Sequence, residues 1–367
     1  MTKILITFLF VNLCVISAFA QNDSLQVTRV NRDTIDYWHY IQNGNKIFAI
    51  NKTGKLKIWD LDKFDTISFK GNQNKIKYSS VAKDVHNNIF VSATDGSVFK
   101  LSAHDYSPSL YLKIKRPIQR LAFNSKNALF LVTQAGVYDT ESKRYWNKFT
   151  IHAPGLLPVK KRKLIFFKES LKNGYFSSPQ YVFLDNQDRL WMSASYGEFG
   201  TDMEVFDTGK RKILDSLAKK ARNTISNPNS FFNDDQGNLY ITAGLQHFMN
   251  WGNISRIDKN DVATELFDGK IKGTENRMFI GPGAFNKTDN SIYFATTSGF
   301  FKAPVKGDDF TPQFLFKTNL SWSREPMAIG VAMTIKQVSF TEDNKLLFLT
   351  TNNGFGIYDG KKLILFK

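Results

Sequence analysis

The sequence contains almost no cysteine. Cys14 is the only one in 367 residues, and it lies in an N-terminal segment that we expect to be removed. The mature chain would then have no thiol, which excludes disulfide bonds, cysteine nucleophiles and zinc–thiolate sites from it. Such a chain must be held together by burial of apolar surface, and its length allows a large core.

Long hydrophobic runs are missing beyond the first twenty residues. Lys3 supplies a positive charge, residues 4–16 are mostly apolar, and Ala18-Phe19-Ala20 places small residues where signal peptidase reads them. A membrane anchor is the alternative, but the run is shorter than the ~20 residues of a spanning helix. We therefore expect residues 1–20 to be a cleaved signal peptide. Residues 21–367 would be secreted or periplasmic, with no transmembrane segment.

The motifs of common enzyme classes are also absent. The sequence has no Gly-x-Ser-x-Gly elbow, no Walker loop and no His-Glu-x-x-His. The five histidines are scattered and lack the spacing of a metal site. These absences leave the enzyme question open but favour a non-catalytic protein, and they predict no cofactor.

Acidic residues are outnumbered by basic ones, 33 to 49, which gives a formal net charge of +16. A balance this basic attracts polyanions such as acidic glycans or nucleic acid. The lysines are spread along the whole chain, however, which favours a solvated surface as the explanation. A polyanion partner is therefore one alternative among several.

One sequence pattern recurs seven times. A polar turn precedes four or five apolar residues, a turn with glycine follows, and a second short apolar run completes the copy. The copies start about 40 to 60 residues apart, and a four-stranded propeller blade needs about 40 to 50 residues. The first aliphatic residues of the seven copies are Ile47, Ile89, Leu129, Leu190, Leu239, Ile292 and Leu346.

Further short apolar runs flank most copies, as at residues 181–184 before one copy and 66–70 after another. Asp, Asn and Gly cluster between the runs, which is typical of hairpin turns. Four meandering strands per copy predict an all-β protein: a single β-propeller of seven four-stranded blades over residues 34–367, with six or eight blades as alternatives. Residues 25–30 would pair with the last blade as a clasp. Helical periodicity is nearly absent, and its best case, residues 213–222, could be a loop with one turn.

The repeat resembles those of known β-propeller families. Residues 185–197 (Asp-Asn-Gln-Asp-Arg-Leu-Trp-Met-Ser-Ala-Ser-Tyr-Gly) are similar to the repeat of two-component-regulator-type propellers, in which an Asp/Gly turn precedes Leu-Trp and a small-residue stretch ends in Gly. Residues 234–244 are similar. Ile58-Trp59-Asp60 resembles a WD-type strand end, although the Gly-His partner of that motif is missing from this blade. The resemblance implies the propeller fold but does not identify a binding partner.

Insertions predict where a binding site would lie. In a propeller, the loops between second and third strands and the connections between blades share one face, and the long segments of this sequence belong to these two classes. Aromatic and charged residues around a concave mouth suit sugar or peptide recognition, although each could serve only to fold its own loop. The residues that such a surface would display are Tyr196, Glu198, Asp202, His247, Trp251, Arg277, Arg324 and Glu325.

Two smaller groups suggest specific chemistry. Glu198 and Asp202 share one loop and could supply an acid–base pair or a calcium site, although acidic pairs are common in solvated turns. The run Lys160, Lys161, Arg162 and Lys163 could grip phosphate or sulfate groups of a polyanion. More often such a run lies at an exposed hairpin tip, where it guards an adjacent β-prone segment against aggregation.

Three functions follow from these patterns. The first is an exported, non-catalytic binding propeller that recognises a protein or glycan in the envelope or extracellular space through one loop-rich face. The second is a metal-dependent propeller hydrolase or lyase, resembling calcium-dependent lactonases, with its site at the channel mouth. The third is adhesion to polyanions, which salt would weaken steeply.

Overall fold

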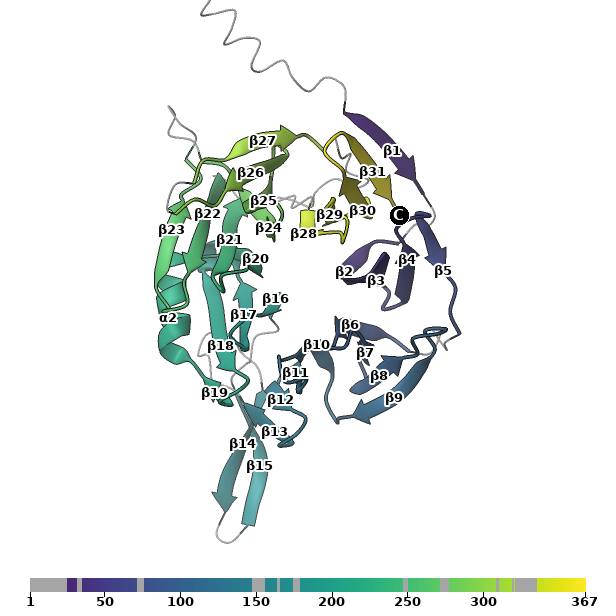
Figure 1. Ribbon diagram of the computed structural model, residues 1–367. Coiled ribbons are helices and arrows are strands. Elements are labelled where there is room, and N and C mark those ends of the chain that lie inside the picture. Colours follow the sequence, from purple (N-terminus) through teal and green to yellow (C-terminus); the bar gives the residue numbers. More distant parts are fainter. Residues whose placement is uncertain are drawn as a thin grey trace, which may run out of the picture.

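The protein is a single seven-bladed β-propeller (Figure 1). The computed structural model describes residues 25–31, 35–70, 76–146, 156–163, 166–173, 179–246, 250–270, 277–307, 310–318, 320 and 335–367, and of 156–163 and 166–173 it describes only the backbone. Seven antiparallel sheets of four consecutive strands stand in a ring, as the repeat predicted. The expected signal peptide, residues 1–20, lies outside this range. No helix within the described residues is long and apolar enough to cross a membrane.

Each blade runs from an innermost strand at the axis to an outermost strand at the rim. Blade 1 contains β2 (Tyr37–Asn43), β3 (Lys46–Asn51), β4 (Leu56–Asp60) and β5 (Asp65–Ile67). Blade 2 contains β6 (Tyr78–Lys83), β7 (Ile89–Ala93), β8 (Ser97–Leu101) and β9 (Pro108–Lys113). Blade 3 contains β10 (Ile118–Phe123), β11 (Leu129–Thr133), β12 (Gly136–Asp139) and β13 (Arg144–Trp146).

The remaining blades follow in the same order. Blade 4 contains β16 (Tyr181–Leu184), β17 (Arg189–Ser195), β18 (Thr201–Asp207) and β19 (Lys212–Ile213). Blade 5 contains β20 (Pro228–Asn233), β21 (Leu239–Gln246), β22 (Asn250–Ile257) and β23 (Ala263–Phe267). Blade 6 contains β24 (Ile280–Asn286), β25 (Ser291–Thr296), β26 (Phe300–Pro304) and β27 (Gln313–Phe316). Blade 7 contains β28 (Ile335–Phe340), β29 (Leu346–Thr350), β30 (Phe355–Tyr358) and β31 (Lys362–Phe366).

The second strand of each blade explains why the repeat is visible in the sequence. β7, β11 and β29 are buried at every residue, because both of their faces pack against neighbouring blades. A strand buried on both faces must be apolar throughout rather than alternating. All seven second strands begin at or next to the aliphatic residues that mark the copies.

The hydrophobic core is divided among the spaces between the blades. Seven clusters of buried residues fill the seven junctions between neighbouring sheets. Aromatic residues dominate where blade 7 meets blade 1: the rings of Trp59 and Phe366 lie 5.3 Å apart, and those of Phe355 and Phe366 are stacked at the same distance. Each blade therefore depends on both of its neighbours for burial.

β-bulges interrupt the innermost strand in six of the seven blades, close to its first residue. A bulge turns the local side chains away from the regular alternation. Several of these side chains then bond to the innermost strand of the next blade. The Ser80 hydroxyl accepts from the Leu121 amide at 3.2 Å, and the Gln337 amide group donates to the Tyr40 carbonyl at 3.0 Å. Hydrogen bonds between innermost strands thus add to the apolar packing that holds neighbouring sheets together.

The N-terminal strand joins the last blade. β1 (Gln26–Val30) pairs in parallel with β31 along its whole length and becomes a fifth strand at the rim of blade 7. The backbone amide of Lys367 also donates to the carbonyl of Val30 at 2.9 Å. Because the chain then continues into blade 1, this pairing holds the ring closed.

Two elements lie outside the blades. α2 (Asp215–Thr224) connects blades 4 and 5, and it is a ten-residue helix rather than the single turn that the sequence left open. Its Leu217, Ala218 and Ala221 are buried in the core between these blades. The second element is a two-stranded hairpin, β14 (Leu156–Lys163) and β15 (Phe166–Asn173), which projects away from the ring in Figure 1.

Candidate functional site

The two faces of the ring differ in what they carry. We call turn face the side with the turns between first and second strands and between third and fourth strands. We call loop face the opposite side, with the second-to-third-strand loops and the connections between blades. The sequence places its candidate site on the loop face.

The blade 4 loop brings three of the predicted residues together. It contains the short 3-10 helix η1 (Gly197–Phe199), and the hydroxyl of Tyr196 donates to the carboxylate of Asp202 at 3.1 Å. Glu198 is exposed in the same loop. The loop is tied down at its end, because the hydroxyl of Thr201 accepts from the amide of Asn227 at 2.7 Å. It also presents Phe199, whose side chain is 85% exposed and which the sequence reasoning missed.

The other predicted residues do not join this group in one site. Trp251 lies on β22 and packs against the core between blades 4 and 5, so part of its surface serves folding. Arg277 forms a 3.8 Å ion pair with Asp268 on the blade 5 to blade 6 connection. His247, Arg324 and Glu325 lie outside the described residues.

The basic run lies on the projecting hairpin. Lys160–Lys163 are the last residues of β14, and Lys163 pairs with Phe166, the first residue of β15. The backbone thus places the four basic residues at the end of a hairpin, and their role in binding a polyanion is a prediction.

A second group lies on the loop face where blades 7 and 1 meet at the axis. The mouth cluster consists of Asp36, Trp38, Lys52, Lys336 and Lys367. Trp38 is the bulged residue of β2 and is 58% exposed, with the ammonium of Lys336 4.9 Å from its ring centroid. Lys52 forms a 3.1 Å ion pair with Asp36, and Lys367 also pairs with this carboxylate.

The mouth cluster carries excess positive charge, because three lysines share one carboxylate. Burial is the main cause that lowers the pKa of Lys336 to about 8, and repulsion from Lys52 adds to it. An aromatic face beside cationic groups suits a sugar ring that carries acidic substituents. The sequence signal for Trp38 was weak, because the bulge breaks the alternation around Tyr37-Trp38-His39 that would have marked it as exposed.

Nearer the centre of the ring lie His39 and Arg120, on the innermost strands of blades 1 and 3. Burial, aided by the charge of Arg120, lowers the pKa of His39 to about 3. Nε2 of His39 is buried and has no hydrogen-bond partner among the described residues. Burial likewise lowers the pKa of Arg120.

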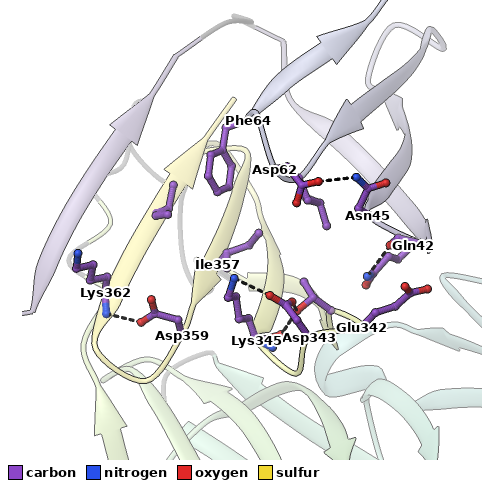
Figure 2. Close-up of a pocket in the computed structure, with 14 residues that line it drawn as sticks. Gln42, Asn45, Asp62, Phe64, Glu342, Asp343, Lys345, Ile357, Asp359 and Lys362 are labelled. Carbon is purple, nitrogen blue, oxygen red and sulfur yellow. Dashed lines mark hydrogen bonds and ion pairs between the residues drawn. The ribbon is translucent and has the colours of Figure 1, made fainter.

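No metal cluster is found in the described part of the chain, where no three His, Cys, Asp or Glu residues gather closely enough to hold an ion. The cavity that stands out lies on the turn face instead, between blades 7 and 1, with a volume of about 260 Å³ (Figure 2). Its walls are short turns, so the long insertions of the sequence gave no signal for it.

Known structures match the fold. No protein-family model and no curated protein sequence matches this chain. Among solved structures, the extracellular domain assigned to a hybrid two-component system of B. thetaiotaomicron is 13% identical with a TM-score of 0.53, over 89% of this chain and 41% of that one. Hydrazine synthase of Kuenenia stuttgartiensis is 10% identical with a TM-score of 0.53, over 89% and 96% of the two chains. At such identities the likeness shows the propeller fold alone, and this chain spans about two fifths of the B. thetaiotaomicron domain.

Proposed function

We propose that this protein is an exported, non-catalytic binding domain that recognises an acidic glycan at the mouth cluster on its loop face. The exposed ring of Trp38 carries the proposal. Trp is among the residues that contribute most to binding energy, because its large ring offers an apolar face on which a ligand can stack. The ring supplies a stacking surface, and Lys336 and Lys52 supply charges for carboxylate or sulfate groups of a sugar.

The comparisons support an extracellular role without naming a ligand. One neighbour is described as an extracellular domain, and the N-terminal sequence has the pattern of a signal peptide. The other neighbour is described as an enzyme, so the fold is compatible with more than one kind of function. The proposal of an acidic glycan as the ligand therefore rests on the side chains of the mouth cluster and not on the comparisons.

Calorimetric titration of residues 21–367 with an oligogalacturonate tests it, with a neutral cello-oligosaccharide of equal length as the control ligand. We expect the acidic sugar to bind, and Trp38→Leu to weaken binding by about tenfold or more, as truncation of a central aromatic contact does. Tyr111→Leu is the matched control, because Tyr111 is 55% exposed on the rim strand β9. Equal binding of the neutral sugar, or no effect of Trp38→Leu, would refute the proposal.

A second candidate is recognition of a protein through the blade 4 loop. Phe199 favours it, because an apolar side chain that is almost fully exposed on an anchored loop can fill a pocket of a partner. Envelope proteins captured by the wild type but not by Phe199→Ser would support this function. Capture that survives Phe199→Ser, yet falls steeply with salt, would instead indicate the polyanion adhesion expected for Lys160–Lys163.

A further inference from the structure

The cavity on the turn face lies where the ring closes. Its walls come from the β2–β3 and β4–β5 turns of blade 1 and from the β28–β29 and β30–β31 turns of blade 7. Leu61, Phe64, Ile357 and Ile364 give it an apolar floor, and Figure 2 shows the Phe64 ring at its edge. A ligand here would touch the first and the last blade at once.

The charge of this cavity is opposite to that of the protein. Four carboxylates line it against two lysines, in a chain with a net charge of +16. Three of the carboxylates are engaged: Asp62 accepts from Asn45 at 2.7 Å, Asp343 pairs with Lys345 at 2.6 Å, and Asp359 accepts two backbone amides. The fourth, Glu342, is exposed and has no hydrogen bond or ion pair to any described residue.

A departure from the repeat explains why Glu342 has no partner. In each turn between first and second strands, one residue has a left-handed backbone, and in blades 3 and 4 that residue is Asn127 or Asp188. Its side chain bonds to the turn of the preceding blade: Asn127 accepts from the Val85 amide at 3.2 Å, and Asp188 accepts from the Ser125 hydroxyl at 2.6 Å.

Glu342 occupies in blade 7 the turn position that Val85 and Ser125 occupy in blades 2 and 3. The left-handed residue of the next blade, which should face it, is Gly44. Gly44 has no side chain to offer, and its turn is shorter than those of the other blades. At the junction of blades 7 and 1 the structure therefore leaves a carboxylate and an open space, whereas the junctions of blades 2 and 3 and of blades 3 and 4 have a turn-to-turn hydrogen bond.

Phe64 forms one wall of the cavity. It holds a left-handed backbone, with φ of 49°, which bulky residues avoid because of steric strain. Its ring packs 5.3 Å from that of Phe366 and so forms a fixed apolar wall. Tyr106, Lys143, Arg211 and Asp261 hold the same left-handed backbone in the third-to-fourth-strand turns of blades 2 to 5, so this conformation belongs to the repeat.

We infer that this cavity binds an ammonium or guanidinium group on an apolar stem, with the stem on the floor and the cation at Glu342 and Asp62. Such a group can belong to a free amine or to a lysine or arginine side chain of another protein. The inference does not depend on the glycan proposed for the loop face, because it involves the opposite face and a ligand of opposite charge.

Calorimetric titration with n-pentylamine tests the inference, and n-pentanol serves as the uncharged ligand of the same length. We expect the amine to bind and the alcohol to bind at least tenfold more weakly. Nα-acetyl-lysinamide, which mimics a lysine inside a protein chain, separates the two sources. If it binds as well as the amine does, the ligand is a protein side chain, and if only the amine binds, the ligand is a free amine.

Two variants probe the geometry. Replacing Glu342 by Gln together with Asp62 by Asn should weaken amine binding about tenfold, since two partly exposed charge contacts are lost. Gly44→Asn should abolish binding, because it adds the kind of side chain that bridges the turns of blades 2 and 3 and of blades 3 and 4. A Cβ at Gly44 would meet no atom within 4 Å, and Asn tolerates its backbone, so this variant should fold.

The matched control is Gly237→Asn in blade 5, which has the same left-handed backbone and the same free space but lies at another junction. It should bind the amine like the wild type. The inference is overturned if neither cationic probe binds, if n-pentanol binds as tightly as n-pentylamine, or if Gly44→Asn and Gly237→Asn behave alike.

Discussion

The side chain of Asp185 stabilises a turn and also accepts hydrogen bonds from buried side chains. Its carboxylate accepts from the backbone amides of Gln187 and Arg189, which shapes the turn between β16 and β17. The same carboxylate accepts from the indole of Trp191 at 2.7 Å and pairs with the Arg189 guanidinium at 2.6 Å. Arg189 also bonds to Asp261 in blade 5, so the network joins two blades.

Replacing Asp185 by Ala should therefore destabilise the protein by about 3–5 kcal/mol, because a buried guanidinium loses one of its two counterions. Urea unfolding followed by fluorescence would measure the change. Lys113→Ala is the control: it breaks an exposed 2.8 Å pair with Asp95 and should cost less than about 1 kcal/mol. The interpretation requires that Arg189→Met, added to Asp185→Ala, recovers part of the loss.

His39 makes stability depend on pH. Its pKa of about 3 in the folded state lies below its ordinary value of 6.5, so protonation favours the unfolded chain. The contribution of His39 to the free energy of unfolding is complete above pH 6.5 and is lost as the pH falls from 6.5 towards 3. The slope from this residue reaches at most about 1.4 kcal/mol per pH unit. His39→Gln should flatten the unfolding free energy between pH 6.5 and 5, and an unchanged slope would show that other groups dominate.

At the scale of elements, β1 lies outside the seven four-stranded blades, so it can be removed without shortening any of them. Val27 packs against the core between blades 6 and 7, and Val30 against the core between blades 7 and 1. A chain of residues 31–367 should be less stable than one of residues 25–367 by about 2–3 kcal/mol, the value of burying two valines. Thermal unfolding measures this difference. Equal midpoints would mean that the five-residue parallel pairing contributes nothing to closure.

The seven second strands could be predicted because burial on both faces leaves an unbroken apolar run in each. α2 was underestimated, since only Leu217, Ala218 and Ala221 are buried in the core, while the other residues of the helix are polar or charged. Trp38 was missed because a bulge reverses its alternation. The cavity at Glu342 lies beside Gly44, which has no side chain to fill the space. Such a gap cannot be read from one sequence, because it becomes visible only when the turns of successive blades are superimposed.

At the scale of the whole molecule, calcium separates a metal-dependent enzyme from a binding domain. The expected ligands are Glu198 and Asp202, although Asp202 already accepts a hydrogen bond from Tyr196. If the enzyme reading holds, millimolar calcium should raise the unfolding midpoint of chelator-treated protein by several degrees, because ligand at a hundred times its dissociation constant adds about 2.7 kcal/mol. The shift should vanish in Glu198→Ala/Asp202→Ala. The binding function predicts no shift in either protein.

The parallel pairing of β1 with β31 also bears on how the molecule resists force. Residue 25 and residue 367 lie at opposite ends of the paired strands, because Gln26 stands beside Lys362 and Val30 beside Phe366. Tension applied between the two termini would pull these strands past each other, so all their hydrogen bonds would bear the load at once. An antiparallel clasp pulled from one end would unzip bond by bond. The ring is thus closed by a mechanical clamp, and stretching from the termini should meet its main resistance at blade 7.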